Sequence, residues 1–579
     1  MKKLTILAGA VLLALSVSAQ SSMPRVEVRS GHTSLIVDDQ PFYALAGELH
    51  NSSTGSVEYM KMQINKLPYF NTIIAPVSWE LLEPAEGQFD YTLTDALLET
   101  AMENQKRVVL LWFGSWKNGA STYAPEWVKR DTKRFPLAQK KDGTVTTTLS
   151  TFGTATAQAD AKAFQALMQH LKEVDTQHTV ICVQVENEMG TEDTIAAFTG
   201  GDNIFMRDFS PAATKAYQGA VPAALISYLK KNKKTLDPAI LKAWETQGCP
   251  EKGTWEQVFG KSQNDEGEDF HAHYPYLTEE IFQAWNYATY VEQIASQGKS
   301  TYPLPLYVNA WMKTAGQKEP GKYPSGGPQA HLMDIWRAGA PSIDFLAPDI
   351  YEVGIFDQIC QDYQQKENLL FIPETKVDAT AVARELYAFG QYAPASYAPF
   401  GIDGGGLTNS AEPQNQRLFN KLNFYLQLIY PELQKYLGTE KAAGILAEPG
   451  QTTAPIQMGK YSIMLRPFST VSSMALFGTA SDGKKLEPLP TGVLILQTGD
   501  DEFLLVTGPG ASTVIFGKGE KSKAKNVSYA AVDELRVSYD DQDHPTLVPH
   551  RLNGDETAFG GPTGKENEIS IFRVKMYEY

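Results

Sequence analysis

Eight short apolar runs constrain the fold more than any other feature of this sequence. Each run is continuous rather than alternating, rich in β-branched or aromatic residues, and bounded by turn signals, as expected of parallel strands buried on both faces. Helix-like stretches, at residues 91–105, 157–174 and 381–390, lie between the runs. This alternation predicts an α/β fold, a (β/α)8 TIM barrel, rather than an open sheet. The runs span residues 42–49, 72–77, 107–113, 180–186, 304–310, 343–350, 369–373 and 397–402.

The 579 residues exceed one ordinary domain of about 100–200 residues, so further segments are expected around the barrel. More than a hundred residues separate the fourth and fifth runs, with helical signals at 212–231 and 237–247, and predict a helical insertion at about residues 190–300. From about residue 448, short strands separated by Gly, Asp and Pro turns predict an all-β sandwich. We therefore expect a barrel over residues 20–445 and a β-sandwich-like accessory domain over residues 446–579.

Residues 1–19 have the pattern of a secretory signal peptide. Lys2 and Lys3 precede an apolar run, and the small residues Val17-Ser18-Ala19 follow it. The run is too short to span a bilayer of about 30 Å as a helix, and no later segment approaches about 18 apolar residues. We expect the mature protein to be exported to the periplasm or the extracellular space without a membrane span. A polar stretch at 30–40 predicts a hairpin before the first barrel strand.

Composition excludes several classes of protein. The aromatic residues, 26 Phe, 27 Tyr and 9 Trp, exclude disorder. A formal charge of -16 without a Lys/Arg stripe argues against nucleic-acid binding. Cys182, Cys249 and Cys360 can form at most one disulfide, so we expect the core to supply the stability. The sequence leaves the oligomeric state open.

Two carboxylates follow apolar runs, which is unusual because burial strongly disfavours an ionised group unless it is paired or used. Glu188 follows the fourth run, in Val185-Glu186-Asn187-Glu188, and Glu374 follows the seventh. The carboxyl ends of barrel strands open onto the active face, so these two groups can face each other. Glycoside hydrolysis needs such a pair: one carboxyl protonates the leaving oxygen, and the other attacks the anomeric carbon or activates water. The alternative is a surface strand end with solvated glutamates.

The motif Gln184-Val185-Glu186-Asn187-Glu188-Met189-Gly190 resembles glycoside hydrolase family 35, the β-galactosidases, in a divergent bacterial branch with a β-rich C-terminal domain. Gly47-Glu48-Leu49-His50 and the stretch 70–90, with its Asn-Thr, Trp, Glu-Pro and Gly-Gln-Phe-Asp elements, resemble further signatures of that family. The resemblance implies that Glu188 is the acid/base and Glu374 the nucleophile. It also implies that Asn187 holds the substrate 2-hydroxyl.

One stretch departs from the family pattern. The usual strand-three Cys-Ala-Glu-Trp, whose Glu helps to read galactose hydroxyls, is replaced here by residues 111–119. Glu80, Lys117 or Asn118 is expected to substitute for it. Because the family Glu is missing, the galactose preference stays open at this point.

Further site residues follow from the ends of the strands. Tyr351 ends the sixth run, where a Tyr hydrogen-bonds the nucleophile in related barrels. Asn309 and Trp311 end the fifth strand, and Trp112 and Trp116 end the third. The tryptophans are expected to stack on the C–H faces of sugar rings, and the alternative for each is packing in the core or under a lid.

Metal chemistry is not expected. His271-Ala272-His273, beside Glu268 and Asp269, could ligate a metal, but this pattern in an acidic loop is more typical of solvated surface. The sequence has no HExxH, GxSxG or Gly-rich phosphate motif. We therefore expect no cofactor.

Together these features predict a retaining, exo-acting β-galactosidase that trims plant-type oligosaccharides or polysaccharides. A β-glycosidase of other sugar preference, such as a β-D-fucosidase, α-L-arabinopyranosidase or β-glucosidase, is the first alternative. A carbohydrate-binding protein on an inactive barrel is the second. Retention of both Glu188 and Glu374 argues against inactivity, because a binding site gains little from two uncompensated carboxylates.

Overall fold

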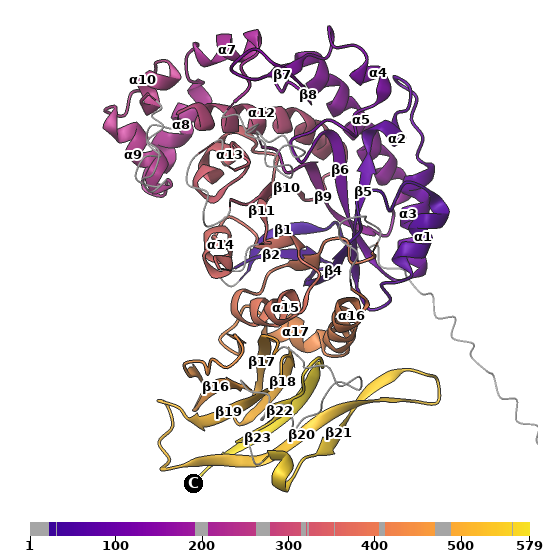
Figure 1. Ribbon diagram of the computed structural model, residues 1–579, viewed down its shortest axis with the longest axis vertical. Coiled ribbons are helices and arrows are strands. Elements are labelled where there is room, and N and C mark those ends of the chain that lie inside the picture. The colour runs from indigo at the N-terminus through magenta and orange to yellow at the C-terminus, as the bar shows by residue number, and fades with distance from the viewer. Residues whose placement is uncertain are drawn as a thin grey trace, which may run out of the picture.

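The computed structural model shows an elongated molecule, with a helix-covered barrel at one end and a β-rich domain at the other (Figure 1). It describes residues 22–29, 32–190, 207–261, 278–313, 320, 323–351, 354–404, 412–468, 488–557 and 560–579. The predicted signal peptide and the His271-Ala272-His273 motif lie outside these residues. Among the described helices, none has both the length and the apolar character needed to cross a membrane.

The predicted barrel is confirmed. Eight strands pair in parallel in the order β11-β10-β9-β6-β5-β4-β13-β12. The edge strands meet through a parallel bridge between Ile350 and Thr375, and the Ile350 N–H donates to the Glu374 carbonyl at 2.9 Å, so the sheet closes on itself. Each predicted run overlaps one strand: β4 (Ala44–Glu48), β5 (Thr72–Ser78), β6 (Arg107–Lys117), β9 (Val180–Asn187), β10 (Leu306–Trp311), β11 (Phe345–Asp349), β12 (Phe371–Thr375) and β13 (Ser396–Pro399).

Helices cover the outside of the barrel, as the apolar spacing predicts. The three predicted stretches correspond to α3 (Thr92–Glu103), α5 (Thr154–Val174) and α15 (Ala379–Tyr392). In α5 the buried residues Ala157, Ala161, Phe164, Met168 and Leu171 recur every three or four positions, which forms one apolar face toward the barrel. Further helices of the barrel region are α1 (Val57–Ile64), α2 (Trp79–Leu82), α4 (Glu126–Lys129), α12 (Thr278–Thr301), α13 (Met333–Gly339) and α14 (Phe356–Tyr363).

The insertion after β9 is helical where it is described. It contains α7 (Pro211–Tyr217), α8 (Ala223–Asn232), α9 (Pro238–Thr246) and α10 (Trp255–Phe259), which lie beside α12 and α13 in Figure 1. The stretch predicted as one helix at 212–231 is two helices. Pro222, which has no N–H to donate, is the N-cap of α8 and separates it from α7.

A small N-terminal sheet closes the lower end of the barrel. Strands β2 (His32–Val37) and β3 (Gln40–Pro41) form the predicted hairpin, and β1 (Arg25–Arg29) pairs with β2 as a third strand. Leu35 and Val37 pack with inward-facing barrel residues such as Ile74 and Phe371 in one apolar cluster. Apolar side chains of this small sheet therefore fill the adjoining end of the barrel interior. The three cysteines are unpaired, and Cys182 lies in this same cluster.

The C-terminal domain is a sandwich of two antiparallel sheets. Side chains from both sheets, including Ile463, Val493, Leu505, Val514 and Val574, share one core. The larger sheet has the order β14-β17-β18-β23-β20-β21 and the smaller the order β15-β16-β19-β22. Their strands are β14 (Ala442–Ala447), β15 (Ile456–Met458), β16 (Tyr461–Pro467), β17 (Thr491–Gly499), β18 (Glu502–Pro509), β19 (Ser512–Lys518), β20 (Val527–Tyr539), β21 (Pro545–Arg551), β22 (Thr563–Gly564) and β23 (Ser570–Glu578).

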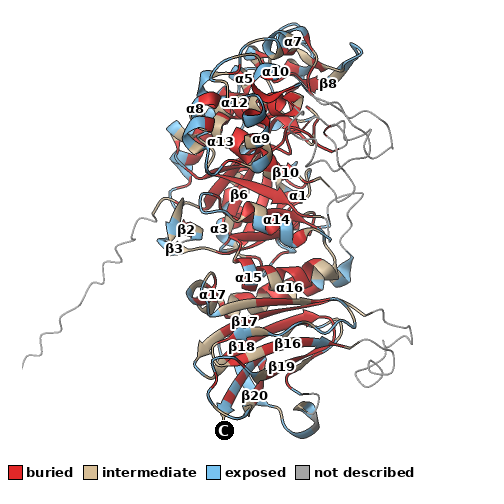
Figure 2. Cartoon of the chain, turned by 90° about the vertical axis from the view of Figure 1, so that its left-hand side faces the viewer, coloured by how far each residue is buried: buried red, intermediate tan, exposed pale blue. Residues whose placement is uncertain are grey.

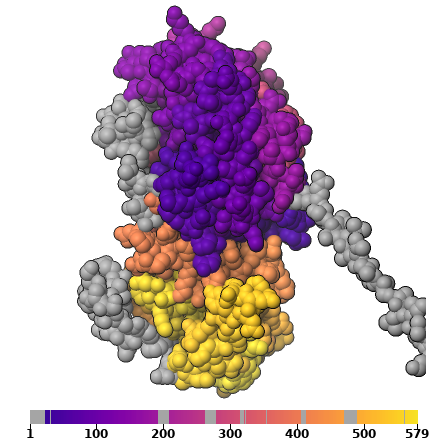
Figure 3. Space-filling view, turned by 90° about the vertical axis from the view of Figure 1, so that its right-hand side faces the viewer, coloured from indigo at the N-terminus to yellow at the C-terminus, as the bar shows by residue number. Residues whose placement is uncertain are grey.

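The sandwich packs directly against the barrel. Leu494, Leu496 and Val506 of the larger sheet belong to the same buried cluster as the residues between the barrel and its helices, and Figure 2 shows buried residues on both sides of this seam. Figure 3 shows the chain around residue 400, with α16 (Pro413–Leu428) and α17 (Tyr430–Tyr436) after it, between the barrel and the sandwich. The accessory domain thus shares its core with the barrel.

We expect Gly492→Ala to destabilise this seam. A Cβ at Gly492, in β17, would lie 1.8 Å from the carbonyl oxygen of Ala383 in α15, so helix and sheet would have to separate. The free energy of unfolding should fall by about 3 kcal/mol, the upper range for overpacking, in a denaturant titration. Gly499→Ala in the same strand is the control, because its added Cβ would come no closer than 3.4 Å to any atom. Equal stability of the two variants would contradict the close packing.

Candidate active site

The carboxyl end of β9 carries Asn187 and Glu188 into the mouth of the barrel. Glu186 and Glu188 have φ angles of 60° and 46°, in the left-handed region that side chains other than glycine rarely adopt. This backbone interrupts the regular alternation of side chains along the strand. The side chains of Glu186 and Glu188 therefore lie in different surroundings, although the residues are two positions apart. Strain of this kind is concentrated at functional sites.

Glu188 and Glu374 meet across the mouth. Both side chains are buried, each residue being 4% exposed, and one carboxylate oxygen of each lies within 4.8 Å of the other. Glu374 Oε2 accepts a hydrogen bond from the Tyr351 hydroxyl at 2.7 Å. Its Oε1 accepts longer hydrogen bonds, both 3.4 Å, from the side-chain amides of Asn187 and Asn309. Tyr351 thus lies against Glu374.

The end of β6 supplies the groups around Asn187 and Glu188. The pairing of β6 with β9 shifts between Trp112 and Lys117, and Asn118 has a φ of 51°, so a bulge turns this segment over the mouth. The Asn118 amide donates to Glu188 Oε2. The Lys117 ammonium donates to Asn187 Oδ1 at 2.8 Å and thereby turns the Asn187 N–H group toward Glu374.

A third carboxylate, Asp349, was missed from the sequence. It ends β11, is 1% exposed, and has an oxygen within 4.8 Å of those of Glu188 and Glu374. Asn309 connects the three acids: its amide donates to Asp349 Oδ2 at 2.8 Å and to Glu374 Oε1 at 3.4 Å, and its oxygen accepts from the Glu188 N–H at 2.9 Å. The signal that selected Glu188, an acid at the end of an apolar run, is also present in Phe345-Leu346-Ala347-Pro348-Asp349.

Glu48, at the end of β4, is a fourth buried acid. The residue is 0% exposed, and neither carboxylate oxygen has a hydrogen-bond partner among the described residues. Burial raises the pKa of Glu48 well above its usual range, and the negative charge of Glu374 raises it further. Glu48 is therefore protonated over a wider pH range than an exposed glutamate.

We expect Glu48→Gln to stabilise the protein increasingly as the pH rises. A carboxyl whose pKa is raised on folding is most stabilising below its unfolded pKa, and this contribution is lost as the pH rises through the folded pKa. Glutamine does not titrate, so the difference in melting temperature between variant and wild type should grow from pH 5 to pH 8. Thermal unfolding at several pH values measures it. A constant difference would show that Glu48 does not titrate with folding.

Glu186 is part of the scaffold. Its carboxylate accepts from the backbone N–H groups of Ser115 at 3.2 Å and Trp116 at 2.7 Å, and thereby holds the bulge of β6. Burial and the neighbouring charge of Asp160 raise the pKa of Glu186 well above its usual range. Asp160, on α5, accepts from the same Ser115 N–H at 2.8 Å and from the Trp112 indole at 2.8 Å.

The remaining predicted site residues are less directly connected to the acids. Trp116 is 3% exposed and packs edge-on against Tyr287, with ring centroids 5.1 Å apart, which corresponds to the core alternative. Trp311 is half-buried at the end of β10. Glu80, on α2, has a side chain 37% exposed and pairs with Lys129 at 3.2 Å.

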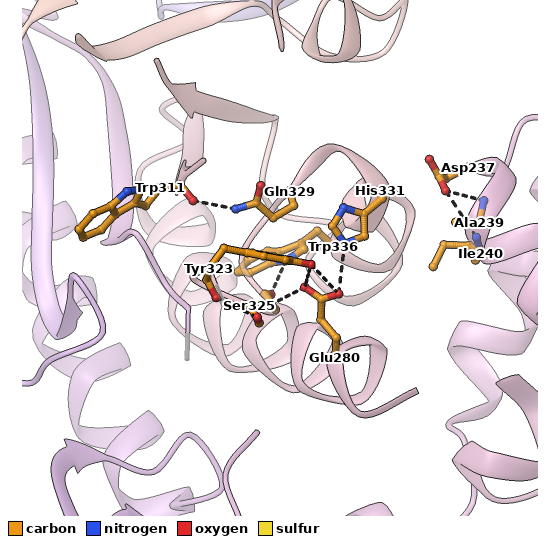
Figure 4. Close-up of polar contacts among 11 residues, drawn as sticks. Asp237, Ala239, Ile240, Glu280, Trp311, Tyr323, Ser325, Gln329, His331 and Trp336 are labelled. Carbon is orange, nitrogen blue, oxygen red and sulfur yellow. Dashed lines mark hydrogen bonds and ion pairs between the residues drawn. The ribbon is translucent and has the colours of Figure 1, made fainter. Parts of the chain in front are cut away.

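A buried polar network supports the loop that follows β10 (Figure 4). Glu280, on α12, accepts hydrogen bonds from the Tyr323 hydroxyl at 3.0 Å and the Gly326 N–H at 3.2 Å, and its other oxygen lies 3.2 Å from His331 Nε2. Gln329 donates to the Trp311 carbonyl at 2.7 Å. At Gly327 this loop packs so closely on the Met189 carbonyl that an added Cβ would lie 2.5 Å away. The network therefore braces the chain directly after Glu188.

The one group of potential metal ligands among the described residues is Glu188, Asp349 and Glu374. Carboxylate oxygens alone would suit a hard cation such as Mg²⁺. However, N–H and O–H donors from Asn309 and Tyr351 already point at these oxygens, an arrangement that stabilises carboxylates without a cation. The donor set therefore fits acid–base chemistry better than metal binding.

Comparison with known families agrees with this chemistry. The family model of the glycoside hydrolase family 42 β-galactosidases matches residues 55–314, and that of a domain of unknown function, DUF5597, matches residues 425–561. No curated protein matches the sequence. The protein is a glycoside hydrolase. The resemblance to family 35 is not supported, because the matching β-galactosidase model is that of family 42.

Several solved structures resemble this chain at low sequence identity. The catalytic domain of a β-amylase from Paenibacillus polymyxa is 11% identical, with a TM-score of 0.47, over 66% of this chain and 97% of its own. A β-galactosidase from Rahnella sp. R3 is 16% identical, with a TM-score of 0.43, over 69% of this chain and 59% of its own. One from Halorubrum lacusprofundi is 14% identical, with a TM-score of 0.44, over 68% and 58%. The chain thus spans less than two thirds of these two β-galactosidases.

Proposed function

We propose that this glycoside hydrolase is a retaining, exo-acting β-galactosidase that releases terminal β-linked galactose from plant-type oligosaccharides or polysaccharides. The observation that carries the proposal is the separation of the two buried acids. Retaining enzymes hold their carboxyl groups about 5–5.5 Å apart, whereas inverting enzymes leave about 6.5–9.5 Å for a water molecule. Oxygens of Glu188 and Glu374 within 4.8 Å favour retention. The match to the β-galactosidase model supports the sugar.

In the first step Glu188 is the acid and Glu374 the nucleophile. Glu188 gives its proton to the glycosidic oxygen as the bond from that oxygen to the anomeric carbon breaks. Tyr351 holds Glu374 Oε2 at 2.7 Å, whereas among the described residues Oε1 has the two 3.4 Å contacts alone, so Oε1 is the freer oxygen to attack the anomeric carbon. The product is a glycosyl ester of Glu374.

In the second step Glu188, now a carboxylate, takes a proton from water. The water oxygen attacks the anomeric carbon, Glu374 leaves as a carboxylate, and the sugar departs with its original configuration. Asn187 is placed to donate to the substrate 2-hydroxyl, because Lys117 holds its oxygen and its amide N–H lies beside Glu374. Asn118 orients Glu188 through its hydrogen bond to Oε2.

A β-glycosidase of different sugar preference is the second candidate. The observation behind it lies at the end of β6, where Trp116 is packed in the core and Lys117 is bound to Asn187, and no residue of β6 is an acid that could bind sugar hydroxyls. The preference for the sugar C4 and C6 groups then depends on other side chains. A β-D-fucosidase, an α-L-arabinopyranosidase and a β-glucosidase are the forms to test.

Hydrolysis of a panel of 4-nitrophenyl glycosides tests both candidates. The panel comprises the β-D-galactopyranoside, β-D-fucopyranoside, α-L-arabinopyranoside and β-D-glucopyranoside, which differ at C4 or C6. We expect the highest kcat/KM on the galactoside and β-galactose as the first anomer seen by NMR. A higher kcat/KM on another member would select the second candidate. α-Galactose as the first anomer would contradict retention.

We also propose that the protein is exported, with residues 1–19 as the signal peptide. The basic start, apolar run and small residues before position 20 support this. Expression of the full gene followed by N-terminal sequencing of the periplasmic and medium fractions tests it. A mature chain that begins near Gln20 is the expected result, and an intact Met1 confined to the cytoplasm would contradict export.

A further inference from the structure

Asp349 has no part in the two-carboxylate mechanism, yet it lies beside both catalytic acids. It ends β11 and is almost completely buried, and one of its oxygens lies within 4.8 Å of oxygens of Glu188 and Glu374. Two apolar strand neighbours, Ala347 and Ile350, are also buried. An aspartate in this position is costly to the fold unless it is used.

The hydrogen bonds of Asp349 satisfy only half of its carboxyl group. Oδ2 accepts from the Asn309 amide at 2.8 Å, whereas the buried Oδ1 has no N–H or neutral O–H donor among the described residues. A neighbouring acid, Glu188, is within hydrogen-bonding reach. Two carboxylates can form a hydrogen bond only when one of them carries a proton. The contact between the Asp349 and Glu188 carboxyl groups is therefore favourable if one proton lies between them.

The surrounding charges favour a proton on the Glu188–Asp349 pair. Burial, and then the negative charges of Glu374 and Glu188, raise the pKa of Asp349 well above its usual range. The tyrosines near Asp349 stay neutral, since burial raises their pKa as well. The nearby cation, Lys117, is bound to Asn187. The titratable groups that face Asp349 are Glu48 from β4, Glu188 from β9, Tyr307 from β10, Tyr363 from α14 and Glu374 from β12.

We propose that Asp349 is a positioning residue for the catalytic acid: it shares one proton with Glu188 and retains that proton in the site until the substrate binds. The proposal rests on the proposed function. Paired carboxylates that share one proton release it only at higher pH, because its loss leaves two negative charges side by side. Asn309 fixes the geometry, since it binds the Asp349 carboxyl and the Glu188 backbone together.

The charges balance through the reaction. In the first step the shared proton passes to the leaving oxygen, and the Glu188–Asp349 pair is left with two negative charges. At the same moment an electron pair of Glu374 forms the bond to the anomeric carbon, so Glu374 becomes a neutral ester and the total charge is unchanged. In the second step water returns a proton to the pair as Glu374 regains its negative charge.

Asp349→Asn tests the proposal. Asparagine keeps the shape but removes the charge that opposes deprotonation of Glu188. We therefore expect the alkaline limb of the pH profile of kcat/KM to move to lower pH by about one unit. At pH 8 the loss should be about 10-fold for a 4-nitrophenyl glycoside and much smaller for the 2,4-dinitrophenyl glycoside, whose leaving group needs no proton. An unchanged alkaline limb, or equal losses on both substrates, would overturn the proposal.

Tyr351→Phe is the matched control, because it removes a hydrogen bond from Glu374 and leaves the Glu188–Asp349 pair intact. It should lower kcat without moving the alkaline limb. Thermal unfolding of each variant checks that the fold is kept. If wild type hydrolyses no glycoside, or if Glu374→Gln retains activity, the proposed function itself fails. If wild type is active but the alkaline limb of the pH profile does not move in Asp349→Asn, only the role of Asp349 is rejected.

Discussion

Glu374→Gln should lower kcat/KM on the preferred aryl glycoside by about 10⁵-fold, because an amide cannot form the glycosyl ester. Glutamine can keep the hydrogen bond from Tyr351 and has nearly the same volume, so the loss is chemical rather than structural. Initial rates, with thermal unfolding as a check on the fold, measure it. Unchanged turnover would reject Glu374 as the nucleophile.

Rescue by azide is a second test of Glu374 as the nucleophile. In Glu374→Ala, azide can enter the vacated space and attack the anomeric carbon directly. The expected product is the α-glycosyl azide, with inverted configuration, identified by NMR. Formation of the β-glycosyl azide would instead place the replaced group on the leaving-group side of the sugar.

Glu188→Gln should have an effect that depends on the leaving group. Loss of a general acid costs about 10²–10⁴-fold, and the cost is largest where the leaving oxygen needs a proton. We therefore expect a large fall in kcat/KM on natural disaccharides and a small one on the 2,4-dinitrophenyl glycoside, for which hydrolysis of the glycosyl ester should become rate-limiting. Steady-state rates on both substrates measure this.

Glu186→Gln is the control within the same strand. Glu186 is a buried glutamate two residues from Glu188, but it binds the Ser115 and Trp116 backbone. Any loss of activity in this variant should be similar for good and poor leaving groups. A dependence on the leaving group equal to that of Glu188→Gln would mean that the two glutamates cannot be assigned separate roles.

The barrel could be predicted because its strands are buried on both faces, and burial of this kind appears in the sequence as short continuous apolar runs. The same reasoning was weaker in the accessory domain. The sequence predicts strands there at 461–467, 492–497, 502–507, 513–516 and 569–577. It does not predict β20 and β21, since most residues of this hairpin are exposed or half-buried and no apolar run marks them. The division of the first insertion helix at Pro222 was also missed.

The site was predicted in part for the same physical reason. An acid at the end of an apolar run is costly unless it is used, and this selected Glu188 and Glu374. Asp349 and Glu48 carry the same signal but were not selected. Trp116 shows where the prediction is ambiguous, because a tryptophan at the end of a strand is equally compatible with sugar binding and with core packing. Its edge-on contact with Tyr287 corresponds to packing.

The sequence by itself determined the elements of the barrel, its strand order along the chain and the acids at the ends of two strands, because these depend on local burial and on residue type. Only the tertiary structure decided which of those acids meet. Closure of the barrel brings Glu188, Asp349 and Glu374 together from three strands, and the bulge of β6 assigns Glu186 to the scaffold. Such contacts depend on the register and curvature of the closed sheet, which no local pattern of residues records.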